Sequence, residues 1–173
     1  LKVVGNVNQA LGVYYEHRVQ EVAKLPDVKE KGIKESDIRK WFGSQLITAD
    51  GKRNIVVQKR GGKSGGLDDA VVQIFSKRKE LVRDEEHSGA TIYELTHDRL
   101  AKPILANNEA WEKKFGFPFR QQVELWREAE GKGKNVHLLS EEAWSKAEQW
   151  VKDNPDNLSD LEGEFLDACR ANA

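Results

Sequence analysis

The sequence predicts a mainly α-helical fold with a small β component. In most stretches apolar residues recur every three or four positions, as in helices that bury one face. Residues 81–84 and 91–95 read instead as extended runs on either side of a His-Ser-Gly turn, which predicts a hairpin. The pattern changes again at the run Phe-Gly-Phe-Pro-Phe, residues 115–119. We therefore expect one domain over residues 1–115 and a helical appendage over residues 116–173.

The first domain should open with two helices. Residues 7–24 predict a helix with Asn6 as its N-cap. Its apolar stripe would be Val7, Ala10, Leu11, Tyr14, Val22 and Ala23. A shorter helix is expected from residue 35 or 36 to Phe42, with Gly43 as its C-cap.

A small sheet and a third helix should follow. Residues 46–48 and 55–57 predict short strands, and residues 61–66 predict a flexible glycine-rich loop. A helix is then expected from Asp68 or Asp69 to about Glu80, before the hairpin. Helices, a small sheet, another helix and a hairpin "wing" form the order of a winged-helix domain.

The appendage should consist of helices at about residues 119–130, 141–153 and 158–171. Ser140 is a predicted N-cap, and Ser159 with Glu162 forms a capping-box pattern. The helices predict a helical hairpin or a small bundle.

The junction between the hairpin and the next helix contains the candidate site. Residues 91–96 alternate as a strand does, and apolar residues at helical spacing begin at Leu100. Asp98 is expected to cap this helix by accepting a backbone N–H, which would place His97 beside the helix N-terminus. Such a histidine serves either as a structural boundary residue or as a donor to an anion, and the residues favour both equally.

This junction also carries a resemblance. The run YELTHDRLAKPI at residues 93–104 is similar to the end of the winged-helix domain in bacterial novel STAND-class signalling NTPases. The runs GGLDDAVV at 65–72, LVRDEE at 81–86 and EFLDA at 164–168 resemble the same family in order and spacing. A threonine, Thr96, stands where related ATPases have a methionine.

The resemblance implies a non-catalytic regulatory module of a larger signal-transduction ATPase. The module would act as a lid that closes over ADP, with His97 directed to the β-phosphate and Asp98 orienting it. ADP or ATP would be bound by the parent protein, and no cofactor is expected in this part. The expected partners are an upstream ATPase domain of the same chain and a C-terminal sensor or effector region.

Two other functions remain open. Residues 52–83 contain nine basic and three acidic residues, which could make a DNA-binding winged helix. The possible nucleic-acid contacts are Lys59, Arg60, Lys63, Lys77, Arg78 and Lys79. A charged run is, however, usually just a solvated face. The third hypothesis is a stand-alone protein-interaction domain with an apolar or charged docking face.

Several classes of function are not indicated. Residues 61–66 include Gly-Lys-Ser, but Val57 stands where a Walker A loop needs glycine, so no phosphate-binding loop is expected. The histidines are scattered and Cys169 is the single cysteine, so we expect no metal site, no disulfide and no catalytic residues. With no leader and no membrane-length apolar run, we expect a cytoplasmic protein. Methionine is absent even at position 1, so we expect a part of a longer chain.

Overall fold

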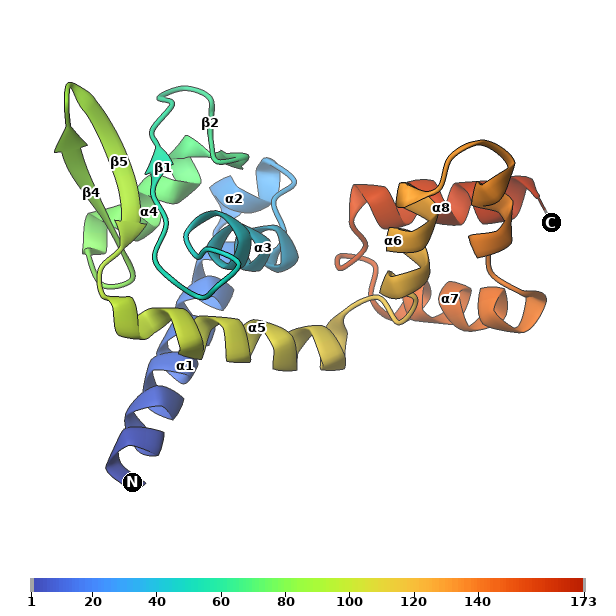
Figure 1. Ribbon diagram of the computed structural model, residues 1–173, viewed down its shortest axis with the longest axis horizontal. Helices are drawn as coiled ribbons and strands as arrows, with labels where there is room; N and C mark the ends of the chain where they lie inside the picture. The colour runs from blue at the N-terminus through green and yellow to red at the C-terminus, as the bar shows by residue number, and fades with distance from the viewer. Residues whose placement is uncertain (1, 173) are drawn as a thin grey trace. The chain divides into compact units, whose positions relative to one another are not determined.

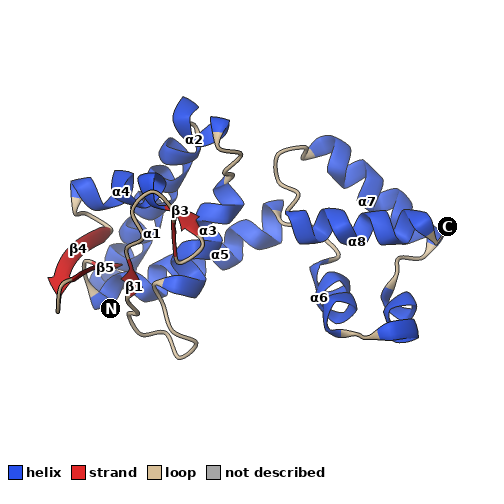
Figure 2. Ribbon diagram, turned by 90° about the horizontal axis from the view of Figure 1, so that it is seen from above, coloured by secondary structure: helices blue, strands red, loops and turns tan. Residues whose placement is uncertain are grey.

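The computed structural model describes residues 2–172, with side chains from residue 7 onward. It is mainly α-helical with a small β component, as the sequence predicts. The chain forms two compact units, Leu1–Ala110 and Trp111–Ala173, and helix α5 contains the point of division. Figures 1 and 2 show the elements of each unit.

Unit 1 contains short strands between its helices. Its helices are α1 (Lys2–Ala23), α2 (Pro26–Glu30), α3 (Glu35–Gln45), α4 (Asp69–Arg78), the 3-10 turn η1 (Asp98–Leu100) and most of α5 (Ala101–Phe115). Its strands are β1 (Val56–Val57), β2 (Lys63–Ser64), β3 (Leu67–Asp68), β4 (Val82–His87) and β5 (Ala90–Leu95). The predicted strand at 46–48 is reduced to one bridge between Ile47 and Arg53.

The main sheet has the strand order β1-β5-β4, and both pairings are antiparallel. Tyr93 of β5 faces Val56 of β1 on one side and Asp84 of β4 on the other. Because side chains alternate across a strand, Tyr93, Asp84 and their every-second neighbours lie on one face of the sheet. This face, called the inner face below, is the one on which Tyr93 is fully buried.

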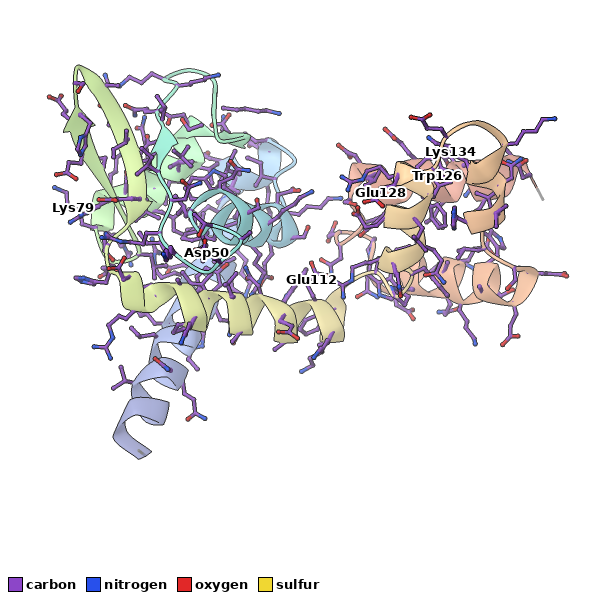
Figure 3. The ribbon with its side chains drawn as sticks, viewed as in Figure 1. Asp50, Lys79, Glu112, Trp126, Glu128 and Lys134 are labelled. Atoms are coloured by element: carbon purple, nitrogen blue, oxygen red, sulfur yellow. The ribbon has the colours of Figure 1, made fainter. Side chains whose placement is uncertain are left out.

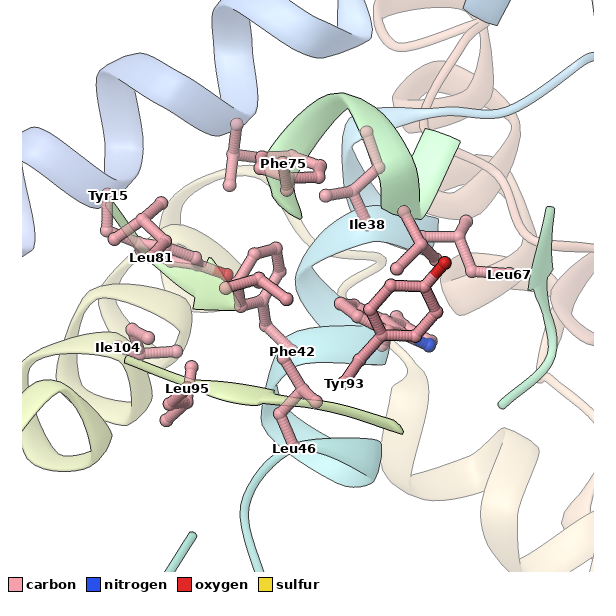
Figure 4. Packing of buried hydrophobic residues seen from close by; sticks show 14 of the residues in the cluster. Tyr15, Ile38, Phe42, Leu46, Leu67, Phe75, Leu81, Tyr93, Leu95 and Ile104 are labelled. Carbon is pink, nitrogen blue, oxygen red and sulfur yellow. The ribbon is translucent and has the colours of Figure 1, made fainter. Parts of the chain in front are cut away.

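The core of unit 1 lies between this sheet and the helices. Tyr15 of α1, Phe42 of α3 and Phe75 of α4 meet edge to face, with ring centroids 5.2 and 5.0 Å apart. Figure 4 shows these rings converging with Leu95 of β5 and Ile104 of α5. Edge-to-face packing is a favoured geometry for aromatic rings, so sequence-distant elements meet here in one specific arrangement.

The structure corrects three details of the predicted helices. Asn6 lies inside α1 rather than at its start, because the helix begins at Lys2. Tyr14 is exposed and Tyr15 is buried, so the helix face differs from the predicted stripe. Gly43 does not end α3; a Cβ there would lie 3.2 Å from the Asn108 amide nitrogen, so glycine permits close approach of α5.

Unit 2 has its own core. It consists of α6 (Arg120–Glu128), the 3-10 helix η2 (Gly131–His137), α7 (Glu141–Asp153) and α8 (Asp160–Ala171). Phe117, Phe165 and Cys169 are among its buried residues. Burial raises the pKa of the Cys169 thiol, which leaves less of the reactive thiolate. The Lys134 ammonium lies over the Trp126 ring, 4.6 Å from its centroid (Figure 3).

Both predicted caps of unit 2 are confirmed. Ser140 caps α7 by accepting from the Ala143 N–H. Ser159 Oγ accepts from the Glu162 N–H at 3.3 Å, and the Glu162 carboxylate accepts from the Ser159 N–H at 2.8 Å. This reciprocal pair is the capping box that the sequence predicts for α8.

Candidate functional site

The junction between β5 and α5 is fixed by Thr96. Its hydroxyl donates to the Glu80 carbonyl at 2.8 Å, and its N–H donates to the Leu81 carbonyl at 3.0 Å. The chain then leaves the sheet with His97 in an extended conformation as the N-cap residue of η1. The His97 side chain is exposed, so a donor is free to meet a group from outside unit 1.

Asp98 does not cap this helix, which corrects the sequence-based expectation. It is the first residue of η1, and no side-chain cap bond forms at the turn. The Asp98 carboxylate instead accepts from the Arg53 guanidinium, which also donates to the Leu95 carbonyl at 3.0 Å. A charge-assisted bond to arginine is stronger than a bond to a neutral backbone donor, which accounts for the difference.

Arg53 also lies 3.8 Å from the Glu94 carboxylate, and Glu94 is paired with Arg83 at 2.5 Å. Beside His97 the structure therefore places an alternating row of charges, and the cation nearest the junction already has two carboxylate neighbours. His97 and Asp98 are consecutive residues, but the Asp98 carboxylate accepts its hydrogen bond from the Arg53 guanidinium and not from the imidazole.

The six predicted nucleic-acid contacts are all exposed. Arg60, Lys77 and Lys79 line a single open cleft of about 680 Å³. Lys59 and Lys63 are not among its lining residues, and Arg78 lies 3.8 Å from Glu21. Lys79 is the left-handed C-cap of α4 and is labelled in Figure 3.

The cleft lies between α4 and the inner face of the β4–β5 hairpin. Its lining consists of Gln58, Arg60, Gln73, Ser76, Lys77, Lys79, Asp84, Glu86, Thr91 and Tyr93. Basic residues come from α4 and from the segment after β1, whereas both acidic residues come from β4. The cleft therefore carries charges of both signs.

A buried carboxylate, Asp69, lies beneath this cleft. The sequence indicates only that this residue stands at a helix start and does not reveal its hydrogen-bond partners. Its side chain accepts from the Tyr93 hydroxyl at 2.7 Å, the Ser64 hydroxyl at 2.8 Å and the Gln73 amide at 2.7 Å. The Gln58 amide lies 3.4 Å from the same carboxylate and donates to Tyr93 Oη at 2.7 Å. Asp69 thereby joins α4, β5, β2 and the segment that follows β1.

The hydrogen bonds decide the charge state of Asp69. Burial by itself would raise the pKa of this carboxyl group, but the bonds from Tyr93, Ser64, Gln73 and Gln58 outweigh burial and lower it. Burial and the neighbouring Asp69 carboxylate raise the pKa of Tyr93. An ionised aspartate and a neutral tyrosine therefore form a fixed donor–acceptor pair.

The Gly-Lys-Ser run is part of a tight hairpin rather than the flexible loop that the sequence suggests. β2 and β3 pair across Gly65 and Gly66, which both have positive φ. The Ser64 carbonyl accepts from the Trp41 indole at 2.9 Å, and Asp68 caps α4 by accepting from the Ala70 N–H. An acidic side chain already occupies this helix N-terminus, which is unfavourable for phosphate.

No family model, curated protein or solved structure matches this chain. Among residues 2–172, no helix is both long enough and apolar enough to cross a membrane. The same part of the chain contains no cluster of three or more histidine, cysteine or acidic side chains arranged to hold a metal ion.

Proposed function

We propose that unit 1 is a non-catalytic winged-helix module of a larger STAND-type signal-transduction ATPase, in which it acts as a nucleotide-state lid. The strand order β1-β5-β4, with α4 between β1 and the hairpin, supports the winged-helix assignment. The observation that carries the lid function is the exposed imidazole of His97 at the first turn of η1. A buried imidazole could not reach a nucleotide held by a neighbouring domain.

The chemistry of the lid follows from that position. A histidine N–H beside a helix start adds a donor where backbone N–H groups already favour an anion. A lid of this kind must contact the ADP-bound and ATP-bound states differently, because a ligand shifts an equilibrium only by its differential affinity. His97 would supply that difference, and Arg53 with Asp98 would hold the junction in place.

The test uses the reading frame that contains this chain together with its ATPase domain. We expect His97→Ala to shorten the retention of bound ADP, measured as the release of labelled ADP into excess unlabelled nucleotide. His87→Ala is the matched control, because His87 is an exposed histidine on the hairpin turn, away from the junction. Unchanged ADP release in His97→Ala, or the absence of an ATPase domain in that reading frame, would remove the lid function.

The alternative, a DNA-binding winged helix, rests on the basic residues of the 59–83 region. Arg60, Lys77 and Lys79 do lie around one cleft. However, Asp84 and Glu86 of the hairpin share that cleft, and a phosphate backbone there would meet two carboxylates. A DNA binder would show affinity that falls steeply with salt, whereas a lid would show no DNA binding.

A further inference from the structure

In the described part of the chain, the charged residues of strand β4 are ion-paired on one face of the sheet and not on the other. On the outer face Arg83 pairs with Glu94 at 2.5 Å and lies 4.0 Å from Glu85, which is 3.8 Å from His87. On the inner face, Asp84 and Glu86 line the cleft and form no ion pair within residues 7–172. Alternate residues of one strand therefore have compensated charges on one face and uncompensated charges on the other.

The opposite wall of the cleft is uncompensated as well. Arg60, Lys77 and Lys79 form no ion pair with any side chain that the structure describes. Elsewhere in unit 1 exposed cations do find partners, as Lys31 does with Asp68 and Arg78 with Glu21. Two walls of opposite sign thus face one another across the cleft without closing it.

The Asp69 network fixes the floor between these walls. Gln58 and Gln73 both direct their amide nitrogens at Asp69, and Gln58 also donates to Tyr93. A carboxylate only accepts hydrogen bonds, so the orientation of both amides is set. The side-chain amide oxygens of Gln58 and Gln73 accept from no other residue in the described part of the chain, so the floor offers hydrogen-bond acceptors.

We propose that this cleft binds an extended polypeptide segment that carries one basic and one acidic side chain. The basic side chain would lie against Asp84 and Glu86, and the acidic one against Lys77, Lys79 and Arg60. Backbone N–H groups of the segment would donate to the carbonyl oxygens of Gln58 and Gln73. The volume of about 680 Å³ is within the range of sites for ligands of several residues or a drug-sized molecule.

The charges of the two walls favour a peptide of mixed charge over the other candidate ligands. A nucleic acid presents negative charge along its whole length, and the β4 wall would repel it. A uniformly basic segment would be repelled by the α4 wall in the same way. A segment of mixed charge satisfies both walls, and this complementarity favours its correct orientation and disfavours the reverse.

The test measures binding of synthetic peptide pools to the full chain. Each end-blocked pool holds seven-residue peptides of glycine, serine and alanine, with two charged positions separated by zero to three residues. One pool has Lys and Asp, one has two Lys, one has two Asp and one has no charge. A labelled 16-base-pair DNA duplex is the nucleic-acid probe. Amide shifts of the 15N-labelled chain locate the site, and anisotropy gives the affinity at low and at moderate salt.

We expect the mixed-charge pool to bind more tightly than the other three and to shift the amides of α4 and β4. Two double variants should each weaken that binding by about tenfold: Lys77→Gln with Lys79→Gln, and separately Asp84→Asn with Glu86→Gln. Each removes two charges opposite in sign to the peptide side chain that they face. All four side chains are exposed, so these variants should fold, which circular dichroism checks. Glu85→Gln, on the outer face of β4, and Lys40→Gln, on α3, are the matched controls and should leave the binding unchanged.

Two results would overturn the proposal. One is equal binding of all pools, or binding that neither wall variant changes. The other is DNA binding that strengthens when Asp84 and Glu86 are neutralised, because the cleft would then be a nucleic-acid surface with a repulsive rim. Neither result bears on His97, which lies beyond the opposite end of β5 from the hairpin turn, so the lid function stands or falls separately.

Discussion

Among single residues, Asp69 has the clearest energetic role. It is 2% exposed, and its carboxylate accepts hydrogen bonds from three different segments besides its own helix. We expect Asp69→Asn to lower the free energy of unfolding of unit 1 by about 2 kcal/mol, because bonds to a charged acceptor become bonds to a neutral one. Urea unfolding measures this change. Asp68→Asn is the control and should alter stability by only a few tenths of a kcal/mol, since asparagine caps a helix as well as aspartate does.

The same residue should make stability depend on pH in the acid range. The pKa of Asp69 is lower in the folded chain than its ordinary value, so the folded state holds the proton less tightly than the unfolded state. Its stabilising effect is complete above about pH 4 and is lost as the pH falls through the lowered folded pKa. We expect the urea midpoint of unit 1 to fall on acidification from pH 5, and to fall less in Asp69→Asn. An equal fall in both proteins would contradict this role.

Gly65 provides a second test at the residue scale. Its φ is 61°, and a Cβ would lie 3.0 Å from both the Trp41 indole nitrogen and a Val56 methyl group. The left-handed backbone alone costs a non-glycine residue about 1–2 kcal/mol, and the crowding adds to it. Gly66 has positive φ but open space, so Gly66→Ala isolates the backbone contribution. We expect Gly65→Ala to destabilise unit 1 more than Gly66→Ala, as measured by thermal unfolding.

At the scale of elements, the capping box of α8 is a local device with a predictable effect. Ser159 and Glu162 satisfy one another's backbone donors at the start of this helix. We expect Ser159→Ala to destabilise unit 2 by about 1 kcal/mol, since an orphan N–H loses its acceptor. Ser145→Ala is the control, because Ser145 lies inside α7 and bonds only the Glu141 carbonyl. A loss as large in Ser145→Ala would show that the cap is not the cause.

Elements with a local signal could be predicted from the sequence, and others could not. The helix predicted from Asp68 or Asp69 corresponds to α4, and the extended runs around Gly89 correspond to β4 and β5. In each, periodicity and a turn residue lie within a few positions. The sequence of the β2–β3 hairpin predicts a loop because its strands have only two residues each. Local sequence around Gly43 predicts a helix end, because the close approach of Asn108 comes from a helix far along the chain.

The candidate site shows the same limit. His97 at a strand-to-helix junction followed from adjacent residues, and the structure leaves it exposed where the sequence placed it. The role of Asp98 did not follow, because its partner Arg53 is 45 residues away. The Asp69 carboxylate accepts hydrogen bonds from Ser64, Gln58 and Tyr93, which lie in other segments of the chain. Only its bond from Gln73, one helical turn away, could be predicted from sequence spacing.

At the scale of the whole molecule, the two units have separate hydrophobic cores. The core of unit 1 is centred on Tyr15, Phe42 and Phe75, and that of unit 2 on Phe117 and Phe165. Each core is a set of cooperative contacts, and cooperative units of one chain often open with different free energies. We therefore expect the two units to unfold in separate steps.

Hydrogen exchange read by mass spectrometry tests this separation, because it reports each segment by itself. Asp69→Asn should speed exchange in α3, α4 and β5, while α7 and α8 keep their protection. Ser159→Ala should do the reverse, since its contacts lie entirely within unit 2. Helix α5 contains the point of division, so its two ends should respond to different variants. If either substitution speeds exchange equally along the whole chain, the cores form one cooperative unit, and a movement of unit 1 as a lid would have to carry unit 2 with it.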